Sequence, residues 1–293
     1  NATYAIVPEV KLFSFAVVSH PLKGGYTYSL PPGQGNCTMR QSKASPAPSI
    51  DADEVARFAA LADQWWDPEG ELKALHRLNP VRLAYSRDRL ADHFAAKLKG
   101  ASELKPLAGL RLLDVGCGGG IFAEPLCRLG AEVVGLDAGA EAVGVARHHA
   151  QAAGLDIDYR QASAEELAAG GEQFDAVLAL EVIEHVADLG AFMTAIGRLV
   201  APGGAFIGAT LNRTMKSWAM AVVAAEYLLG WVPRGTHQWD RFVKPSELAR
   251  QLRPAGLELS DLSGVVYHPL TDAWRLGRDL SVNYLAFATK RDR

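Results

Sequence analysis

Features that define several other protein classes are scarce in this sequence. Only three cysteines occur among 293 residues, Cys37, Cys117 and Cys127, and no two of them form a C-x-x-C pair. A disulfide framework is therefore excluded, and a reducing compartment is the simplest interpretation. Runs of 18 or more apolar residues are absent as well, so the sequence predicts no membrane-spanning helix.

Positive charge is not in excess either. The 30 Lys and Arg residues are outnumbered by 33 Asp and Glu residues, which gives a formal net charge of −3. Domains that bind nucleic acid usually carry a surplus of basic residues, so nucleic acid is not an expected partner. Hydrophobic residues make up 49% of the chain, which is ordinary for a globular protein with a full core.

The first 38 residues differ from the rest, since they contain no arginine and one acidic residue, Glu9. A mitochondrial transit peptide would be rich in arginine, and a signal peptide would have a basic start and a long apolar core. The first methionine is Met39. We therefore interpret residues 1–38 as an over-extended gene start, with a targeting or linker segment as the alternative. Residues 1–49 are expected to form a disordered leader, and residues 50–293 the folded domain.

The remaining chain is organised around residues 110–137, which read LRLLDVGCGGGIFAEPLCRLGAEVVGLD. A short apolar run that ends in glycines and continues with helical spacing is typical of a buried strand, a tight turn and a helix. Such a unit brings bare backbone and a helix N-terminus close to a ligand. The pattern D-x-G-x-G-x-G falls on Asp114, Gly116, Gly118 and Gly120.

The glycine spacing also indicates the kind of ligand. The dinucleotide fingerprint requires glycine at its sixth position, which is Ile121 here, so the spacing favours a nucleoside ligand without a pyrophosphate. Asp137 ends the next expected strand, about 20 residues after the first glycine, where a carboxylate can bind ribose hydroxyls. The arrangement resembles the S-adenosylmethionine loop of class I methyltransferases.

Strand and helix patterns alternate from residue 110 onward. Strands are expected at 110–115, 132–137, 156–161, 174–180, 205–211, 258–266 and 283–290, and helices at 121–129, 140–153, 189–199 and 245–253. This alternation predicts a Rossmann-like α/β fold of the class I methyltransferase type, with a seven-stranded, mostly parallel sheet and helices on both faces. Residues 266–278 break the strand pattern and are expected to form a substrate wall.

Two helices are expected ahead of the sheet, at 50–66 and 79–98. The first has apolar residues at spacings of three and four, and either Asp51 or Asp53 can cap its start. Asn79 would cap the second helix, with Pro80 at the first helical position. Together they would form a helical cap, residues 50–100, over the mouth of the cofactor site.

Two carboxylates and an imidazole follow the fourth expected strand, at Glu181, Glu184 and His185. Oxygen ligands suit magnesium or another hard cation, so the three residues form a candidate metal site. His185 could equally act as a general base, because the pKa of histidine lies near neutrality. A third interpretation is structural, with the Glu-His pair only shaping the loop.

The turn after the third expected strand reads ASAEEL, and in this fold such a turn lies along the adenine. The Ala164 amide or the Glu165 carboxylate is therefore a candidate to bind the edge of the base. Ser163 and Glu166 have the spacing of a capping box, which would serve to start a helix. The two interpretations are compatible.

Residues 212–237 combine Trp, Tyr, Met and aliphatic residues with Arg213, Lys216 and Arg234, and Glu226 is the only acid. The apolar part is too short to span a bilayer. Aromatic residues among apolar ones, flanked by cations, are typical of a helix that lies in a membrane interface. The alternative is a lid helix that buries the same side chains against the core.

Several stretches together resemble one family, the ubiquinone-biosynthesis O-methyltransferases. They are WWDPEGELKALHRLNPVRLAY, LDVGCGGGIFAE, LEVIEHV, TLNRTMKSWAMAVVAAEYLLGWVPRGTH, KPSEL and VNY, and they extend over residues 50–290. The glycine loop is generic to methyltransferases, whereas the first and fourth stretches are specific to this family. The resemblance implies an enzyme that uses S-adenosylmethionine to methylate catechol hydroxyls of polyprenylated ubiquinone precursors, at an early and a late step.

The resemblance also implies cofactor contacts. Arg82, in the NPVR stretch, would hold the carboxylate of S-adenosylmethionine. Gly116 would contribute backbone contacts, and Asp137 would bind the ribose. Leu180 occupies a position often filled by methionine and would make an apolar or backbone contact.

The family is similar in needing magnesium, which Glu181, Glu184 and His185 would bind, with Glu181 and His185 as the catalytic pair. It is also membrane-associated, which implies a peripheral location on the inner face of the cytoplasmic membrane, or the matrix face in a mitochondrion. Membrane lipid and an assembly of ubiquinone-biosynthesis proteins are then further expected partners. The alternatives are an O-methyltransferase for another small phenol and a non-catalytic lipid-binding protein on the same scaffold.

Overall fold

The computed structural model describes residues 49–220, 238–268, 271 and 273–292. The chain divides into two units, Asn1–Ala44 and Ser45–Arg293, and every described residue belongs to the second. The expectations of a disordered leader and of a start at Met39 therefore lie outside the described residues. So does most of the segment 212–237.

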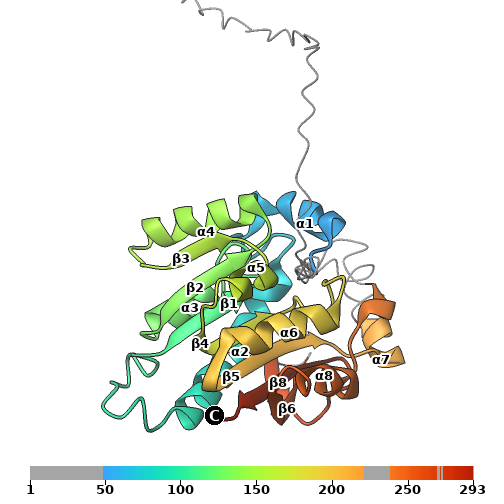
Figure 1. Cartoon of the computed structure of the whole chain (residues 1–293). Helices are drawn as coiled ribbons and strands as arrows, with labels where there is room; N and C mark the ends of the chain where they lie inside the picture. The colour runs from blue at the N-terminus through green and yellow to red at the C-terminus, as the bar shows by residue number, and fades with distance from the viewer. Residues whose placement is uncertain (1–48, 221–237, 269–270, 272, 293) are drawn as a thin grey trace, which may run out of the picture. The chain divides into compact units, whose positions relative to one another are not determined.

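One mixed sheet forms the centre of the second unit (Figure 1). Its eight strands lie in the order β3-β2-β1-β4-β5-β8-β6-β7. Their bounds are β1 (Arg111–Val115), β2 (Glu132–Asp137), β3 (Asp158–Gln161), β4 (Phe174–Leu180), β5 (Val200–Leu211), β6 (Leu257–His268), β7 (Ala273–Gly277) and β8 (Asn283–Lys290). Neighbouring strands among β1 to β5 pair in parallel, whereas β8, β6 and β7 pair antiparallel.

The eighth strand corrects two expectations, the seven-stranded sheet and the break in the strand pattern at residues 266–278. Within that stretch, Val266–His268 belong to β6 and Ala273–Gly277 form β7, with Val266 opposite Arg275 and Tyr267 opposite Trp274. No residue of β7 is fully buried. β7 is a short edge strand in which Trp274 packs against the core, and its five residues are too few to show an alternation of apolar and polar residues.

Helices cover both faces of the sheet, as expected for a doubly wound fold (Figure 1). One hydrophobic cluster joins the sheet to α2 (Lys73–His93), α3 (Ala123–Arg128) and α4 (Ala140–Ala152). A second cluster joins the other face to α5 (Ala164–Ala169), α6 (Leu189–Leu199) and α8 (Pro245–Leu252). Both faces of the central strands β1, β2 and β4 are therefore buried, which explains their nearly continuous apolar sequences.

The helices ahead of the sheet differ from the expected bounds. The first is short, α1 (Ala52–Ala59), and is followed by a single 3-10 turn at Ala62–Gln64. The second, α2, begins six residues before Asn79 and contains Pro80 in its interior. Asn79 does not cap a helix, because it lies inside α2; its Nδ2 donates to the Ile121 carbonyl oxygen at 2.8 Å. Burial of Leu78 and Arg82 on either side keeps the chain helical through the proline.

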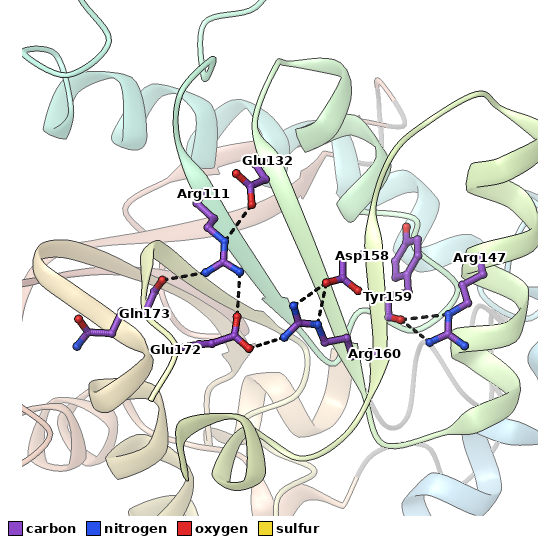
Figure 2. A network of polar contacts seen from close by, with 8 residues as sticks. All are labelled: Arg111, Glu132, Arg147, Asp158, Tyr159, Arg160, Glu172 and Gln173. Atoms are coloured by element: carbon purple, nitrogen blue, oxygen red, sulfur yellow. Dashed lines mark hydrogen bonds and ion pairs between the residues drawn. The ribbon is translucent and has the colours of Figure 1, made fainter. Parts of the chain in front are cut away.

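An ion-pair network joins the amino ends of the parallel strands, away from the strand ends where ligands bind in this fold (Figure 2). Arg111 of β1 donates to Glu132 at 3.0 Å and to Glu172 at 2.9 Å. Arg160 of β3 binds the other oxygen of Glu172 at 2.6 Å and also pairs with Asp158. Glu172, in the turn before β4, therefore bridges two strands that are not neighbours in the sheet.

Candidate functional site

A cavity of about 420 Å³ lies at the carboxyl ends of the central strands. The ends of β1, β2 and β4, the glycine loop, the start of α5, and helices α1 and α2 all contribute to its wall. Parallel strands of a doubly wound sheet present their ligand sites at this edge. The cavity therefore coincides with the location predicted from the sequence.

The glycine loop needs its glycines for two separate reasons. Gly116 and Gly118 have φ angles of +70° and +52°, which L side chains rarely adopt. A Cβ atom on Gly116 would also lie 2.0 Å from Cγ2 of Val182, and one on Gly118 would lie 2.2 Å from the indole ring of Trp65. Trp65 thus packs directly on the loop and closes one side of the cavity.

Asp114 and Asp137 lie together beneath this loop. Asp137 accepts hydrogen bonds from the backbone N–H groups of Gly118 at 2.9 Å and Gly139 at 2.8 Å, which hold the turn against the end of β2. Asp114 is buried, and its Oδ2 atom has no hydrogen-bond partner among the described residues. Burial, assisted by the nearby charge of Asp137, raises the pKa of Asp114 to about 7.

The charge of the cavity fits a cationic cofactor such as S-adenosylmethionine. Eight Asp and Glu residues line it, whereas its basic residues are Arg57, Arg82 and His185. The unpaired oxygen of Asp114 adds a buried acceptor. A positively charged sulfonium group is favoured where buried carboxylates outnumber cations.

Of the predicted cofactor residues, Gly118 is covered by Trp65 and does not line the cavity, whereas the others do. Arg82, Ala164, Glu165 and Leu180 all line it. The capping box is present as well, since the Ser163 hydroxyl accepts from the Glu166 amide at 3.1 Å and the Glu166 carboxylate accepts from the Ser163 amide at 2.8 Å. The capping-box interpretation is therefore confirmed, and the adenine contact of Ala164 or Glu165 stays a prediction.

Arg82 and Glu181 form an ion pair at the cavity wall. The Arg82 guanidinium is buried and lies 2.7 Å from Oε1 of Glu181. Glu181 is the only described residue other than glycine with a positive φ angle, +56°. A non-glycine residue in this conformation indicates backbone strain of about 1 kcal/mol or more, and such strain is common at functional sites.

Glu184 and His185 each contact a different residue. Glu184 is buried and accepts a hydrogen bond from Oγ1 of Thr210 at 2.7 Å. Burial and the neighbouring charge of Glu181 raise the pKa of Glu184 to about 7. His185 pairs through Nδ1 with Oε2 of Glu54 at 2.9 Å. Burial by itself would lower the pKa of His185, but the hydrogen bond to Glu54 and the charges of Glu184 and Glu54 together outweigh burial and raise the pKa.

The expected magnesium ligands are therefore not gathered around one point. Glu181, Glu184 and His185 each bind a different partner, and the described residues include no group of three His, Cys, Asp or Glu side chains that could hold a metal ion. The donor set does not fit a metal in this arrangement. The physical reason is that Arg82, Thr210 and Glu54 each engage one of the three side chains.

Sequence reasoning missed two residues of the site, Glu54 and Trp65. Glu54 belongs to α1 and is 7% exposed, yet it reaches His185 at the end of β4. A signal was present, because Glu54 lies one helical turn before Phe58 on the apolar face of the helix. A carboxylate at such a position is buried only when it has a partner.

The described part of segment 212–237 exposes several apolar side chains. Met215 is 69% exposed, Trp218 42% and Met220 46%. Arg213 and Lys216 lie beside them and pair with Glu247 and Asp279. The helices described by the structure include none that could cross a bilayer.

Comparison with known proteins identifies the class first. A family model described as a methyltransferase domain matches residues 80–262. The fold resembles magnesium protoporphyrin IX methyltransferase from Synechocystis, with a TM-score of 0.51 and 20% identity over 81% of this chain and 93% of that one. It also resembles an S-adenosylmethionine-dependent methyltransferase from Aquifex aeolicus, with a TM-score of 0.50 and 14% identity over 79% and 97%. The fold is that of a class I S-adenosylmethionine-dependent methyltransferase.

Curated relatives then identify the family. The ubiquinone biosynthesis O-methyltransferase of Azorhizobium caulinodans is 54% identical over 236 residues, which cover 80% of this chain and 92% of the relative. The enzymes of the same name from a Methylobacterium species and from Sinorhizobium medicae are 52% and 50% identical, over 98% and 96% of their lengths. The chain belongs to the ubiquinone biosynthesis O-methyltransferases and is an S-adenosylmethionine-dependent O-methyltransferase.

Proposed function

We propose that the enzyme methylates a catechol hydroxyl of polyprenylated ubiquinone precursors, with His185 as the base. The observation that carries this proposal is the placement of His185 on the same cavity as the glycine loop, Asp114 and Asp137. A methyl donor bound on the loop and a phenol beside the imidazole would then share one enclosed space. Membership of the family supports ubiquinone precursors as the substrate class.

The cofactor contacts follow from the lining of the cavity. Arg82 would bind the carboxylate of the methionine moiety, in exchange for or in addition to Glu181. Gly116 lines the cavity, and its backbone would approach the cofactor closely, whereas Gly118 would shape the loop beneath Trp65. Asp114 and Asp137 would bind the amino group and the ribose, and Ala164, Glu165 and Leu180 the adenine side of the site.

The residues of this chain would mainly align the phenol with the methyl donor and remove the phenolic proton. When bound, S-adenosylmethionine supplies a methyl group on a positively charged sulfur, so transfer to a phenol leaves a neutral thioether and one proton. Burial and the carboxylate of Glu54 together give His185 a fixed position at the cavity wall. Its imidazole would accept the phenolic proton as the oxygen attacks the methyl carbon.

Magnesium, which the family resemblance implies, is not used in this proposal. Glu181, Glu184 and His185 are bound to Arg82, Thr210 and Glu54, and they share no common point. We therefore derive no step through a metal. Glu181 has the role of an anionic partner for Arg82 instead.

We further propose that the protein binds the surface of a membrane through the segment that begins at Met215. Exposed Met215, Trp218 and Met220 support this role, because methionine and tryptophan at an apolar surface favour the bilayer interface. A polyprenyl substrate is itself a membrane lipid. The inner face of the cytoplasmic membrane, and an assembly of ubiquinone-biosynthesis proteins there, are the expected surroundings.

Incubation of the purified full chain with radiolabelled S-adenosylmethionine and a prenylated catechol, with and without a chelator, tests the proposal. We expect labelled methyl ether in both samples, and a loss of at least about 100-fold in kcat for His185→Gln with cofactor affinity retained. Activity only on unprenylated phenols would favour the other O-methyltransferase function. Loss of activity with chelator, restored by magnesium, would overturn the metal-free arrangement, and binding of lipid without any methyl transfer would contradict an enzyme.

A further inference from the structure

We propose that Glu54 is a positioning residue that sets the orientation of the His185 ring. This inference rests on the proposed function of His185 as the base. Oε2 of Glu54 lies 2.9 Å from Nδ1 of His185, and the two side chains are largely buried. They come from α1 and from the turn after β4, so only the folded protein brings them together.

The contact determines which ring nitrogen faces the reaction. A neutral imidazole carries one N–H donor and one acceptor nitrogen. Because the Glu54 carboxylate can only accept, Nδ1 of His185 must donate to it, which leaves Nε2 as the nitrogen without a proton. Nε2 is therefore the atom available to take a proton from the substrate.

A second contact fixes the plane of the ring. Phe58, one helical turn after Glu54, meets His185 edge to face, with ring centroids 5.4 Å apart and an interplanar angle of 84°. One hydrogen bond and one aromatic contact, both from α1, leave the ring little freedom to rotate. An imidazole held in this way is oriented before the substrate arrives.

Further contacts made by Asp51 and Arg57 hold helix α1 and the Glu54 carboxylate in place. Asp51 caps its N-terminus by accepting from the amides of Asp53 and Glu54, and it pairs with Arg241 at 2.8 Å. Arg57 pairs with the same Glu54 oxygen that receives His185. The carboxylate is thereby kept in position by a neighbour on its own helix, as expected for a residue that orients another.

The test compares Glu54→Gln with Asp53→Asn. Both substitutions replace a carboxylate in the first turn of α1 by its isosteric amide, but Asp53 is exposed and does not contact His185. We expect Glu54→Gln to lower kcat at least about 10-fold, with little change in KM or in cofactor affinity by calorimetry. Asp53→Asn should match the wild type, and both variants should keep the wild-type melting temperature within a few degrees.

Two further measurements separate this inference from the proposed function. In the His185→Gln background, Glu54→Gln should cost no additional activity, because Glu54 acts through His185. Long-range 1H–15N NMR, with the His185 signal assigned by its loss in His185→Gln, should show the Nδ1–H form in the wild type and a shift in Glu54→Gln. Equal kcat values for the Glu54 and Asp53 variants, or an Nε2–H form in the wild type, would overturn the inference. The NMR result decides the positioning even where the substrate assignment is wrong.

Discussion

Asp114 lies beneath the glycine loop with its Oδ2 atom shielded from solvent and without a hydrogen-bond partner among the described residues. Burial and the charge of Asp137 raise its pKa to about 7, compared with about 4 in an unfolded chain. Glu184 has a pKa raised to about 7 as well, because it is buried near Glu181. At the residue scale the site thus holds two acids that are only partly ionised near neutral pH, and a cation bound beside them would favour their charged forms.

The raised pKa of Asp114 predicts a pH dependence of stability without cofactor. Between about pH 4 and pH 7 the folded state binds more protons at this residue than the unfolded state, so stability falls as pH rises. The contribution of Asp114 to the free energy of unfolding is fully present below about pH 4 and lost above about pH 7. It amounts to at most roughly 4 kcal/mol. Thermal unfolding of the wild type and Asp114→Asn at pH 5 and pH 8 tests this.

We expect the melting temperature of the wild type to fall more between these two pH values than that of Asp114→Asn. Asparagine has the same shape and cannot titrate, so it removes the proton linkage alone. Saturating S-adenosylmethionine should weaken the pH dependence of the wild type, because a cation favours the charged carboxylate. Parallel pH curves for the two proteins would show that Asp114 titrates normally.

Gly116 permits a second prediction at this scale, with Gly171 as its control. Both residues have positive φ angles, +70° and +77°, but a Cβ on Gly171 would meet no atom within 4 Å. Alanine at either position adds backbone strain of roughly 1 kcal/mol. Gly116→Ala also forces Val182 away from the cavity wall, so we expect a loss of cofactor affinity of at least about 10-fold by calorimetry. Gly171→Ala should lower stability in urea and leave cofactor affinity unchanged.

At the element scale, the helices and strands with correctly predicted bounds are buried ones. The expected bounds of β2, β4, β8 and α6 agree with the structure because these elements are buried and carry long apolar runs. β7 gave no such signal, since it is exposed at the sheet edge. The start of α2 predicted from Pro80 was wrong, because tertiary packing outweighed the local preference of proline for a first turn.

The network at the amino ends of the strands is also an element-scale feature, and Glu172 is its centre (Figure 2). Arg111 and then Arg160 lower the pKa of Glu172, which shows that both favour its charged form. We expect Glu172→Gln to lower the free energy of unfolding by about 1 kcal/mol, since several partners share one carboxylate. Urea unfolding at low salt measures the loss.

The matched control for this network is Glu258→Gln. Glu258 pairs with Arg291 in an isolated, exposed contact at 3.1 Å, which should contribute close to nothing. The difference between the two variants should shrink at 1 M salt, where the Debye length falls to about 3 Å. If both variants unfold at the same urea concentration in low salt, the three strand ends are held together by their buried faces alone.

At the scale of the whole molecule, the site is assembled from segments that are far apart in sequence. Asp114, Asp137, Leu180 and Glu181 could be predicted because the carboxyl ends of parallel strands meet at one edge. The sequence pattern could not predict that α1 would place Glu54 on His185, since no periodicity encodes the docking of a separate helix. It also could not predict that Glu181, Glu184 and His185 would each bind a different partner, because those partners come from elements distant in the sequence.

Membrane binding is a property of the whole molecule, and it yields the last prediction. The triple variant Met215→Ser, Trp218→Ser, Met220→Ser should pellet with anionic vesicles far less than the wild type. Each large apolar side chain contributes about 1.5–3 kcal/mol when fully buried, so a partition lowered at least about 10-fold is expected even for partial burial. The control is Leu104→Ser, Leu276→Ser, because these leucines are also exposed, Leu104 at 87%, and belong to other segments.

Added salt separates apolar insertion from attraction to charged lipid. Arg213 and Lys216 are already paired with Glu247 and Asp279, so little of their charge is free to attract anionic headgroups. We therefore expect vesicle binding to respond more to the three serine substitutions than to salt. Equal pelleting of the triple variant and its control would instead favour a lid, in which the same side chains cover the cavity and the prenylated substrate reaches it by another route.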